Sequence, residues 1–304
     1  MTADTESAVA GRRYALVHRT VYGYDDVVTA SFGLTHLLPR LTAHQRALAA
    51  TLEVEPAAAD VREHVDFFGN RAAYVEVDVP HTQLVVTARS EVEVLPREPV
   101  DLGRLETPWE AVRDQLAGTV GAAVLEVRQF VLTSPLVPSW PEVTAYAAQI
   151  FTPGRAVGAA LADLTARIHD DFAYTPGATT VRTTLPELLA DREGVCQDFA
   201  HLAVGVLRSV GLAARYVSGY LETTPPPGRD RLVGADASHA WVGTYLPDTG
   251  WVELDPTNGK LVDDRYVVAA YGRDYGDVTP VQGVIFTEST KSSLRVSVDL
   301  SLLV

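Results

Sequence analysis

Apolar and polar residues alternate along much of the first hundred residues. Four runs show this two-residue period, at residues 14–22, 48–54, 73–79 and 84–94. Such alternation is typical of strands with one buried face, and Gly69 followed by Asn70 marks a turn between two of the runs. The pattern predicts a β-rich, β-sandwich-like domain over residues 1–100.

The period changes to that of helices after residues 96–109, a proline-bearing and charged segment that we interpret as a linker. Spacings of three and four residues then recur in several stretches, at residues 120–132, 156–172, 185–192 and 196–210. We therefore predict a linker and helical connection over residues 101–155. A second, mixed domain should cover residues 156–304, with a final strand that returns to a sheet.

The last of these predicted helices begins at the one cysteine of the chain. Cys196 follows Gly194 and Val195, and Gly211 ends the apolar spacing. In the first turn of a helix, unpaired backbone N–H groups and the helix dipole stabilise a thiolate. A lone cysteine is more often a small buried apolar residue, so downstream residues must decide between a structural thiol and a nucleophile.

A histidine and an aspartate follow in two strand-like segments. His239 begins one segment, Asp255 ends the next, and turn-forming residues lie between them, which predicts an antiparallel hairpin. The two side chains share a face only if paired residue numbers sum to an even value, as when Tyr245 lies opposite Trp251. This register would require a five-residue loop over residues 246–250.

Cysteine, histidine and aspartate in this order suit acyl transfer through a thioester. The Cys196 thiolate would attack a carbonyl carbon, and His239 would take the thiol proton and later protonate the leaving group. Asp255 would hold the imidazole in its useful tautomer. Each residue alone has an ordinary structural interpretation, but the three together are far more specific.

Several stretches around these residues resemble the transglutaminase-like superfamily, in particular its bacterial branch. They are residues 172–174, 194–201, 213–220, 238–241 and 254–257. The resemblance implies an α+β, papain-like cysteine-enzyme fold, in which the helix that carries the cysteine packs on an antiparallel sheet. It also implies a β-rich domain before that core.

Further site residues follow from the resemblance and from helix chemistry. The backbone N–H of Cys196 is the natural first donor to an oxyanion. For the second donor, the resemblance points to Tyr174, with Gln197 as the rival. Asp198, near the third helical position, suits a capping role or a place in the cleft. Trp241 either walls the cleft or simply packs.

Net charge and composition limit the kinds of molecule that the protein can bind. A net charge of −14 argues against nucleic acid and anionic membranes, which require clustered cations. The expected partner is a peptide or protein substrate, or an amide-containing small molecule, and the oligomeric state stays open. Eight scattered histidines and one cysteine predict no metal site and no cofactor. The absence of a disulfide pair, of a signal-peptide pattern and of a long apolar run favours a cytoplasmic protein.

Three functions remain open at this stage. The favoured one is hydrolysis of an amide or isopeptide bond, and the first alternative is a protein-glutamine transglutaminase with an amine as acceptor. The second alternative is a non-catalytic binding or scaffold module. The proline-rich segment 223–230 should form a loop near the cleft, and we expect residues 272–280 to border the active site.

Overall fold

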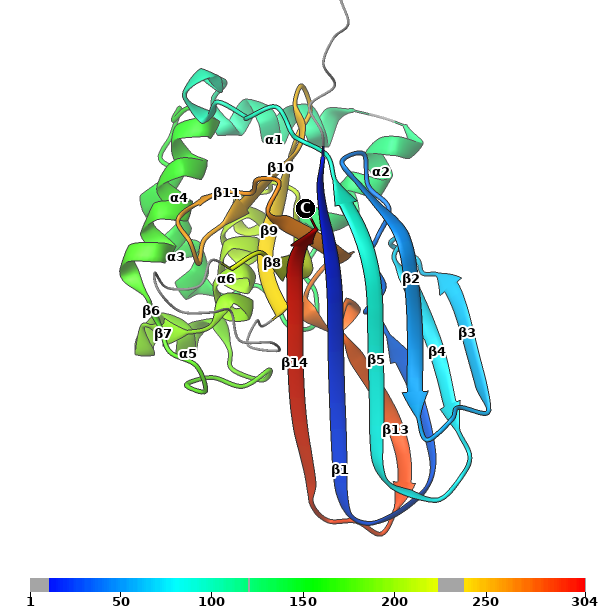
Figure 1. The fold of residues 1–304 in the computed structure, drawn as a ribbon. Helices are drawn as coiled ribbons and strands as arrows, with labels where there is room; N and C mark the ends of the chain where they lie inside the picture. The colour runs from blue at the N-terminus through cyan, green and yellow to red at the C-terminus, as the bar shows by residue number, and fades with distance from the viewer. Residues whose placement is uncertain (1–10, 120, 224–237, 304) are drawn as a thin grey trace, which may run out of the picture.

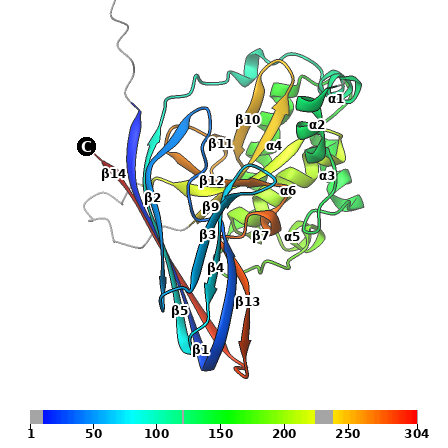
Figure 2. The ribbon, with the colours of Figure 1, turned by 90° about the vertical axis from the view of Figure 1, so that its right-hand side faces the viewer.

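The computed structural model describes residues 11–119, 121–223 and 238–303. Two units lie side by side, a tall antiparallel β unit and a mixed unit of helices and a smaller sheet (Figure 1). Viewed from the side, the long strands form one flank of the molecule and the helices α1 to α6 form the other (Figure 2). The predicted α+β fold class, with a β-rich region before a helix-on-sheet core, is confirmed.

The β unit is one antiparallel sheet that folds back on itself. Its first strand, β1 (Arg12–Thr35), pairs with β5 (His81–Val94) along its first half and with β4 (Arg71–Val77) along its second half. β2 (Gln45–Glu55) extends the sheet beyond β5, and β3 (Asp60–Val65) extends it beyond β4. The pairing is interrupted after Gly23, where the chain bends between the two halves.

This bend produces the sandwich-like layering that the alternating pattern predicts. Apolar side chains from β4 and from β5 meet in one buried cluster, although these strands do not pair with each other: Val75, Val77, Leu84, Val86 and Ala88. Alternate residues of both arms therefore bury the same interior, as expected for facing layers of a sheet.

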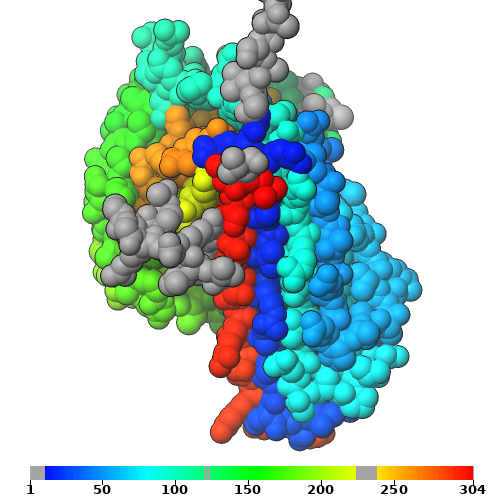
Figure 3. All heavy atoms as spheres, viewed as in Figure 1, coloured from blue at the N-terminus to red at the C-terminus, as the bar shows by residue number. Residues whose placement is uncertain are grey.

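The end of the chain returns to this β unit. β13 (Val281–Thr287) and β14 (Ser292–Leu303) pair with successive halves of β1, on the edge opposite β5 and β4. In Figure 3 the last strand lies directly against the first over much of the surface. The return of the final strand to a sheet is confirmed. Our sequence-based division placed both strands with residues 156–304, whereas their pairing places them in the N-terminal sheet.

The mixed unit consists of six α-helices among the described residues, followed by a five-stranded sheet. The helices are α1 (Trp109–Gly118), α2 (Ala122–Arg128), α3 (Pro141–Ile150), α4 (Val157–Asp171), α5 (Leu185–Asp191) and α6 (Cys196–Ser209). The predicted helices at 156–172, 185–192 and 196–210 are confirmed as α4, α5 and α6. Our sequence reading did not separate α1 and α3 within the helical connection.

The strand order of the smaller sheet is β11-β10-β9-β8-β12. Its members are β8 (Ala214–Leu221), β9 (Ser238–Leu246), β10 (Gly250–Asp255), β11 (Lys260–Leu261) and β12 (Tyr266–Gly272). A two-strand parallel ladder, β6 (Ala173–Tyr174) with β7 (Glu193–Gly194), precedes α6. Of the segment 223–230, only Thr223 falls within the described residues, so its predicted loop lies outside them.

The hairpin of β9 and β10 has the register that the sequence analysis required. Tyr245 pairs with Trp251, and the ladder continues to Val242 opposite Leu254. Leu246 also pairs with Gly250, so the connection has three residues rather than the five we predicted. A β-turn closed by Thr249 N–H on the Leu246 carbonyl, followed by Gly250 at a φ of 86°, accommodates the shorter loop.

Two amide side chains of the β unit seal the outer edge of β12. The Gln45 side chain exchanges two hydrogen bonds of 2.7 Å with the backbone of Val268. Asn70 does the same with Tyr271, at 2.8 Å for both bonds. Both amides are buried. Because a bare strand edge leaves backbone donors and acceptors unpaired, these amides replace a neighbouring strand and fix how the two units dock.

Candidate active site

Cys196 lies at the first residue of α6, as predicted, and its side chain is partly exposed. The turn before it is held by Asp198, whose Oδ2 accepts hydrogen bonds from Val195 N–H at 2.9 Å and Thr179 Oγ1 at 2.6 Å. A Cβ at Gly194 would lie 2.9 Å from the same carboxylate oxygen, so the glycine makes room for this cap. The predicted capping role of Asp198 is confirmed.

His239 connects the thiol to a buried carboxylate. Its Nε2 lies 2.7 Å from Asp255 Oδ2, and its ring interacts electrostatically with Cys196. Since Nε2 faces the carboxylate, Nδ1 is the ring nitrogen left for the thiol. The structure therefore brings all three predicted residues together, at the end of the sheet where β9 begins.

Asp255 is fully buried, with 0% of its surface exposed, yet both carboxylate oxygens have several donors. Besides His239, Oδ2 accepts from Tyr266 Oη and Asn258 Nδ2, each at 2.6 Å. Oδ1 accepts from the backbone N–H groups of Thr257 at 2.9 Å and Asn258 at 3.2 Å. Burial alone would raise the pKa of Asp255, but these donors, His239 first, outweigh it and lower the pKa.

The same contacts raise the pKa of His239, whereas they lower that of Asp255. Burial favours the neutral imidazole, but the hydrogen bond to Asp255 and the interaction with Cys196 favour the cation and raise the pKa of His239 to about 10. The site therefore stabilises an imidazolium between a carboxylate and a sulfur atom, which is the charge arrangement that a thiolate nucleophile needs.

The two candidates for the second oxyanion donor lie on either side of the cysteine. Tyr174 is 53% exposed and interacts electrostatically with Cys196, and burial together with that interaction raises its pKa. The ladder of β6 and β7 pairs Tyr174 with Gly194, two residues before the cysteine. Gln197 is half-buried at the second helical position. Both side chains stay candidates for the second donor.

Trp241 does not line a cleft. It is 0% exposed, and its ring packs against Tyr266 at 5.3 Å and against His239 at 6.0 Å between centroids. The packing interpretation of this residue is therefore the correct one, because a cleft wall must be accessible. A Cβ at Gly219 would lie 2.5 Å from the Trp241 ring, so a glycine opposite His239 admits this tryptophan.

His201 stays outside the mechanism, as expected. Its Nε2 accepts a hydrogen bond from Tyr275 N–H at 3.0 Å, and burial lowers its pKa to about 4. Tyr275 belongs to residues 272–280 and packs on Tyr216 with ring centroids 6.4 Å apart. That segment therefore reaches the second turn of the cysteine helix.

Sequence reasoning missed the residues that hold Asp255. Tyr266 begins β12, eleven residues after Asp255, and no motif marks it. Asn258 offered a weak signal, since an asparagine shortly after Asp-Pro is typical of a turn whose side chains bond to nearby backbone. The contact of Tyr266 depends on the strand order, which places β12 beside β8 rather than beside β10.

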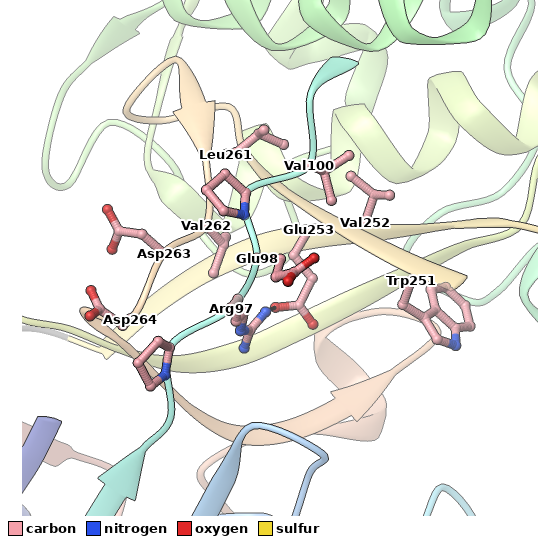
Figure 4. Close-up of a pocket in the computed structure, with 12 residues that line it drawn as sticks. Arg97, Glu98, Val100, Trp251, Val252, Glu253, Leu261, Val262, Asp263 and Asp264 are labelled. Atoms are coloured by element: carbon pink, nitrogen blue, oxygen red, sulfur yellow. Dashed lines mark hydrogen bonds and ion pairs between the residues drawn. The ribbon is translucent and has the colours of Figure 1, made fainter. Parts of the chain in front are cut away.

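Sequence reasoning also missed a buried charge network two residues from Asp255. Glu253 is paired with Arg97 and Arg215, each at 2.9 Å, and it accepts from Tyr271 Oη at 3.2 Å. Arg97 comes from the linker after β5 and points at Glu253 across the pocket drawn in Figure 4. Burial would raise the pKa of Glu253, but the two guanidinium groups lower it to about 2.

Two family models match the chain. "Bacterial transglutaminase-like N-terminal region" covers residues 14–93, and "Transglutaminase-like superfamily" covers residues 144–256, which include the whole Cys196, His239 and Asp255 set. The chain belongs to the transglutaminase-like superfamily. The suspected resemblance is thus confirmed, and the β unit corresponds to the N-terminal region found in the bacterial members.

Relatives of full length come from mycobacteria. The uncharacterized protein Rv2569c of Mycobacterium tuberculosis is 45% identical over 99% of this chain and 97% of its own length. A Mycobacterium leprae protein is 35% identical over 96% of this chain and 99% of its own. A protein-glutamine gamma-glutamyltransferase of Pseudomonas aeruginosa is 39% identical over 92 residues, which are 29% of this chain and 14% of that protein.

A solved structure shares the whole architecture. It is described as a "Putative Cysteine Protease from Cytophaga hutchinsonii", with a TM-score of 0.74 and 20% identity over 95% of this chain and 91% of that one. At this identity the likeness shows the fold, including the arrangement of the β unit and the mixed unit.

The described residues contain no group of three or more histidine, cysteine, aspartate or glutamate side chains placed to hold a metal ion. Within the same residues, no helix has the length and apolar character to cross a membrane.

Proposed function

We propose that this protein is a cysteine-dependent enzyme that transfers an acyl group through a thioester on Cys196, with hydrolysis of an amide or isopeptide bond as its reaction. The observation that supports the proposal is the position of His239, which interacts with Cys196 and is hydrogen bonded at 2.7 Å to the buried Asp255. A structural thiol would not need an imidazole whose pKa is raised to about 10 by a buried carboxylate and the thiol itself.

In the first half-reaction, the Cys196 sulfur attacks the carbonyl carbon of the amide and forms a C–S bond. His239 protonates the leaving nitrogen, the C–N bond breaks, and an amine departs. In the second half-reaction, water attacks the thioester and gives a proton to His239. The C–S bond then breaks, a carboxylic acid leaves, and the proton remains with the thiolate and imidazolium pair.

The oxyanion of each tetrahedral intermediate would be stabilised by the backbone N–H of Cys196, which lies in a first turn where amides have no intrahelical acceptor. Tyr174 is our choice for the second donor because the pairing of β6 with β7 places it beside Gly194, two residues before Cys196. Tyr174→Phe should lower kcat about 100-fold, in the range for loss of one oxyanion donor, while Gln197→Ala should leave kcat within a few-fold.

A transglutaminase reaction, with an amine in place of water in the second half-reaction, is the alternative. The 92-residue match to the Pseudomonas aeruginosa protein-glutamine gamma-glutamyltransferase favours it. Incubation with glutamine-containing peptides, with and without a primary amine, separates the two enzymes. Ammonia release with deamidated peptide supports hydrolysis, and amine-labelled peptide supports transamidation.

Alkylation with iodoacetamide tests whether the site performs chemistry at all. Wild-type protein should react once, at Cys196, and His239→Ala should react at least tenfold more slowly at pH 7, because the imidazole no longer stabilises the thiolate. His64→Ala, which removes an exposed histidine on β3, is the matched control. Equal rates in all three proteins would support the non-catalytic scaffold instead.

A further inference from the structure

A second cavity lies at the junction of the two units, away from the candidate active site. Its volume is about 470 Å³, which is in the range of small-molecule sites. Residues from the β3–β4 turn, from α2 and from the five-stranded sheet line it, and none of Cys196, His239 and Asp255 does. It therefore needs an explanation of its own.

Two arginines, Arg40 and Arg215, supply the positive charge of this cavity. Arg215 stacks between two aromatic rings, 3.4 Å from the Tyr271 centroid and 4.1 Å from the Trp251 centroid. Arg40 lies over the Tyr271 ring at 4.6 Å. Positive charge is thus concentrated at one place on a protein of net charge −14.

This positive charge is not neutralised by the surrounding side chains. Glu253 is shared between Arg215 and Arg97, so one carboxylate serves two guanidinium groups. Within the part of the chain that the structure describes, Arg40 has no carboxylate at ion-pair distance, and Asp66 attracts it only from farther away. Burial and repulsion by Arg215 lower the pKa of Arg40, which indicates that its charge is poorly compensated.

Arg40 is also held so that part of its guanidinium stays available. Its Nη1 donates at 2.6 Å both to the Phe68 carbonyl and to Asn70 Oδ1. For Nε and Nη2 the described residues provide no acceptor. The left-handed turn at Gly69, with a φ of 77°, lets the guanidinium pass, because a Cβ there would lie 3.0 Å from Nη2. A fixed guanidinium with free donors is a typical carboxylate-binding group.

Aromatic side chains form the other wall. Phe67 contacts Phe68 at 5.0 Å between centroids, Phe68 contacts Phe130 at 6.1 Å, and Phe130 contacts Trp251 at 5.4 Å. Phe67 is 83% exposed at the mouth. Contact between an exposed phenylalanine ring and water is unfavourable. A ligand whose apolar group covers the ring would therefore be stabilised there. Glu126, on α2 and exposed, is the one acidic residue of the lining.

We propose that this junction cavity binds an organic anion, with its carboxylate on Arg40 and an aromatic or branched apolar body against Phe67 and Phe68. The charge-assisted bond to Arg40 supplies specificity for the acid, and the aromatic wall supplies apolar contact. A free small acid and the C-terminus of a peptide share this chemistry. The proposal does not depend on the reaction at Cys196.

Calorimetry with the full-length protein tests the site, with N-acetylphenylalanine as the probe and its primary amide as the uncharged control. The acid should bind, and the amide should bind at least tenfold more weakly. A hexapeptide that ends in phenylalanine with a free carboxylate, compared with the single amino acid, separates the two sources of the ligand. Tighter binding of the peptide assigns the site to a chain terminus, and equal binding assigns it to a small acid.

Two variants complete the test. Arg40→Gln should weaken binding of the acid about 10- to 100-fold, while Arg62→Gln, which removes an exposed arginine of the same unit, should not. Phe67→Ser should weaken it several-fold with an unchanged melting temperature, because its ring is largely exposed. Equal binding of acid and amide would overturn the proposal. Unchanged affinity for the acid in both Phe67→Ser and Arg40→Gln would also overturn it. If Arg40→Gln does not fold, the affinity of Phe67→Ser and the ratio of acid to amide binding decide whether the proposal holds.

Discussion

The two faces of the five-stranded sheet differ in whether they carry charged side chains. The face that packs on α6 is apolar, with Ala214, Ala240, Val242, Val252 and Leu254 in the main hydrophobic core. The other face, here called the polar face, holds the charged groups Arg215, His239, Glu253 and Asp255 beside a smaller apolar cluster that includes Val217, Trp241 and Val268. Along β10 the two kinds of residue alternate, because Glu253 and Asp255 flank the core residue Leu254.

The apolar face therefore contributes mainly to stability, and the polar face orients the side chains of the candidate active site. Apolar contacts on the helix face are non-directional, so they hold α6 in place without fixing any single angle. On the polar face each buried group must find a partner, and hydrogen bonds of defined geometry fix the orientation of the imidazole and the carboxylate. One sheet thus positions Cys196 through its apolar face and His239 through its polar face.

The largest expected effect on kcat is that of removing the Asp255 carboxylate from the polar face. Asp255→Asn keeps the volume but removes the charge that orients and stabilises the His239 cation, so kcat for amide cleavage should fall about 10⁴-fold. Circular dichroism and thermal melting check that the variant folds. A loss below tenfold would show that Asp255 serves the fold and not the reaction.

Glu253→Gln tests how much the charge network on the same face contributes to stability. It leaves two buried guanidinium groups without an anion and should reduce the free energy of unfolding by about 3–5 kcal/mol, measured by urea denaturation. Leu254→Ala, its neighbour on the apolar face, should cost about 2–5 kcal/mol through a cavity.

The pH dependence separates these two variants. The pKa of Glu253 is lowered from 4.5 to about 2 in the folded state, so its contribution is fully present above pH 4.5 and is lost as the pH falls towards 2. The deficit of Glu253→Gln relative to wild type should shrink over that window. The deficit of Leu254→Ala should stay constant, and a constant deficit in both would refute the charge argument.

The pKa values of His239 and His201 can be compared within the wild-type protein. NMR titration should show His239 still protonated at pH 8, because its pKa is raised to about 10. His201 should be neutral at pH 5, because burial outweighs the attraction of Asp274 and lowers its pKa to about 4. In Asp255→Asn the His239 titration should move to lower pH while that of His201 stays. Identical titration of the two rings would contradict the contrast between the faces.

The smallest effect should come from Tyr266→Phe, which removes one of the three donors on Asp255 Oδ2. We expect kcat to fall about tenfold with KM unchanged, because the hydroxyl touches the carboxylate and no substrate. Tyr220→Phe, which removes a buried hydroxyl bonded to His18, is the matched control and should leave kcat unchanged. Equal losses in both variants would assign Tyr266 a purely structural role.

Much of the site could be predicted because its signals are local. A glycine, a cysteine and an apolar spacing of three and four residues predict Cys196 at a helix start. The parity rule for paired strands predicts that His239 and Asp255 share a face, and the register of Tyr245 opposite Trp251 confirms it.

The errors arose where distant segments decide the outcome. The pairing of β13 and β14 with β1 joins residues that are 246 (Thr35 and Val281) to 290 (Arg13 and Leu303) positions apart. Alternation shows that a strand exists but not which strand it joins. Trp241 has the same parity as His239, yet it is buried because Tyr266 and Glu253 cover it from other strands.

The sequence by itself determined the elements and the three reactive residue types, because helix and strand periods, turns and caps depend on neighbours a few positions away. Only the tertiary structure decided that Tyr266 donates to Asp255, that the amides of Gln45 and Asn70 bond to the edge of β12, and that Arg40 has no carboxylate at ion-pair distance among the described residues. These outcomes depend on burial and on contacts across the sheet, and no local pattern encodes the partner of a buried polar group.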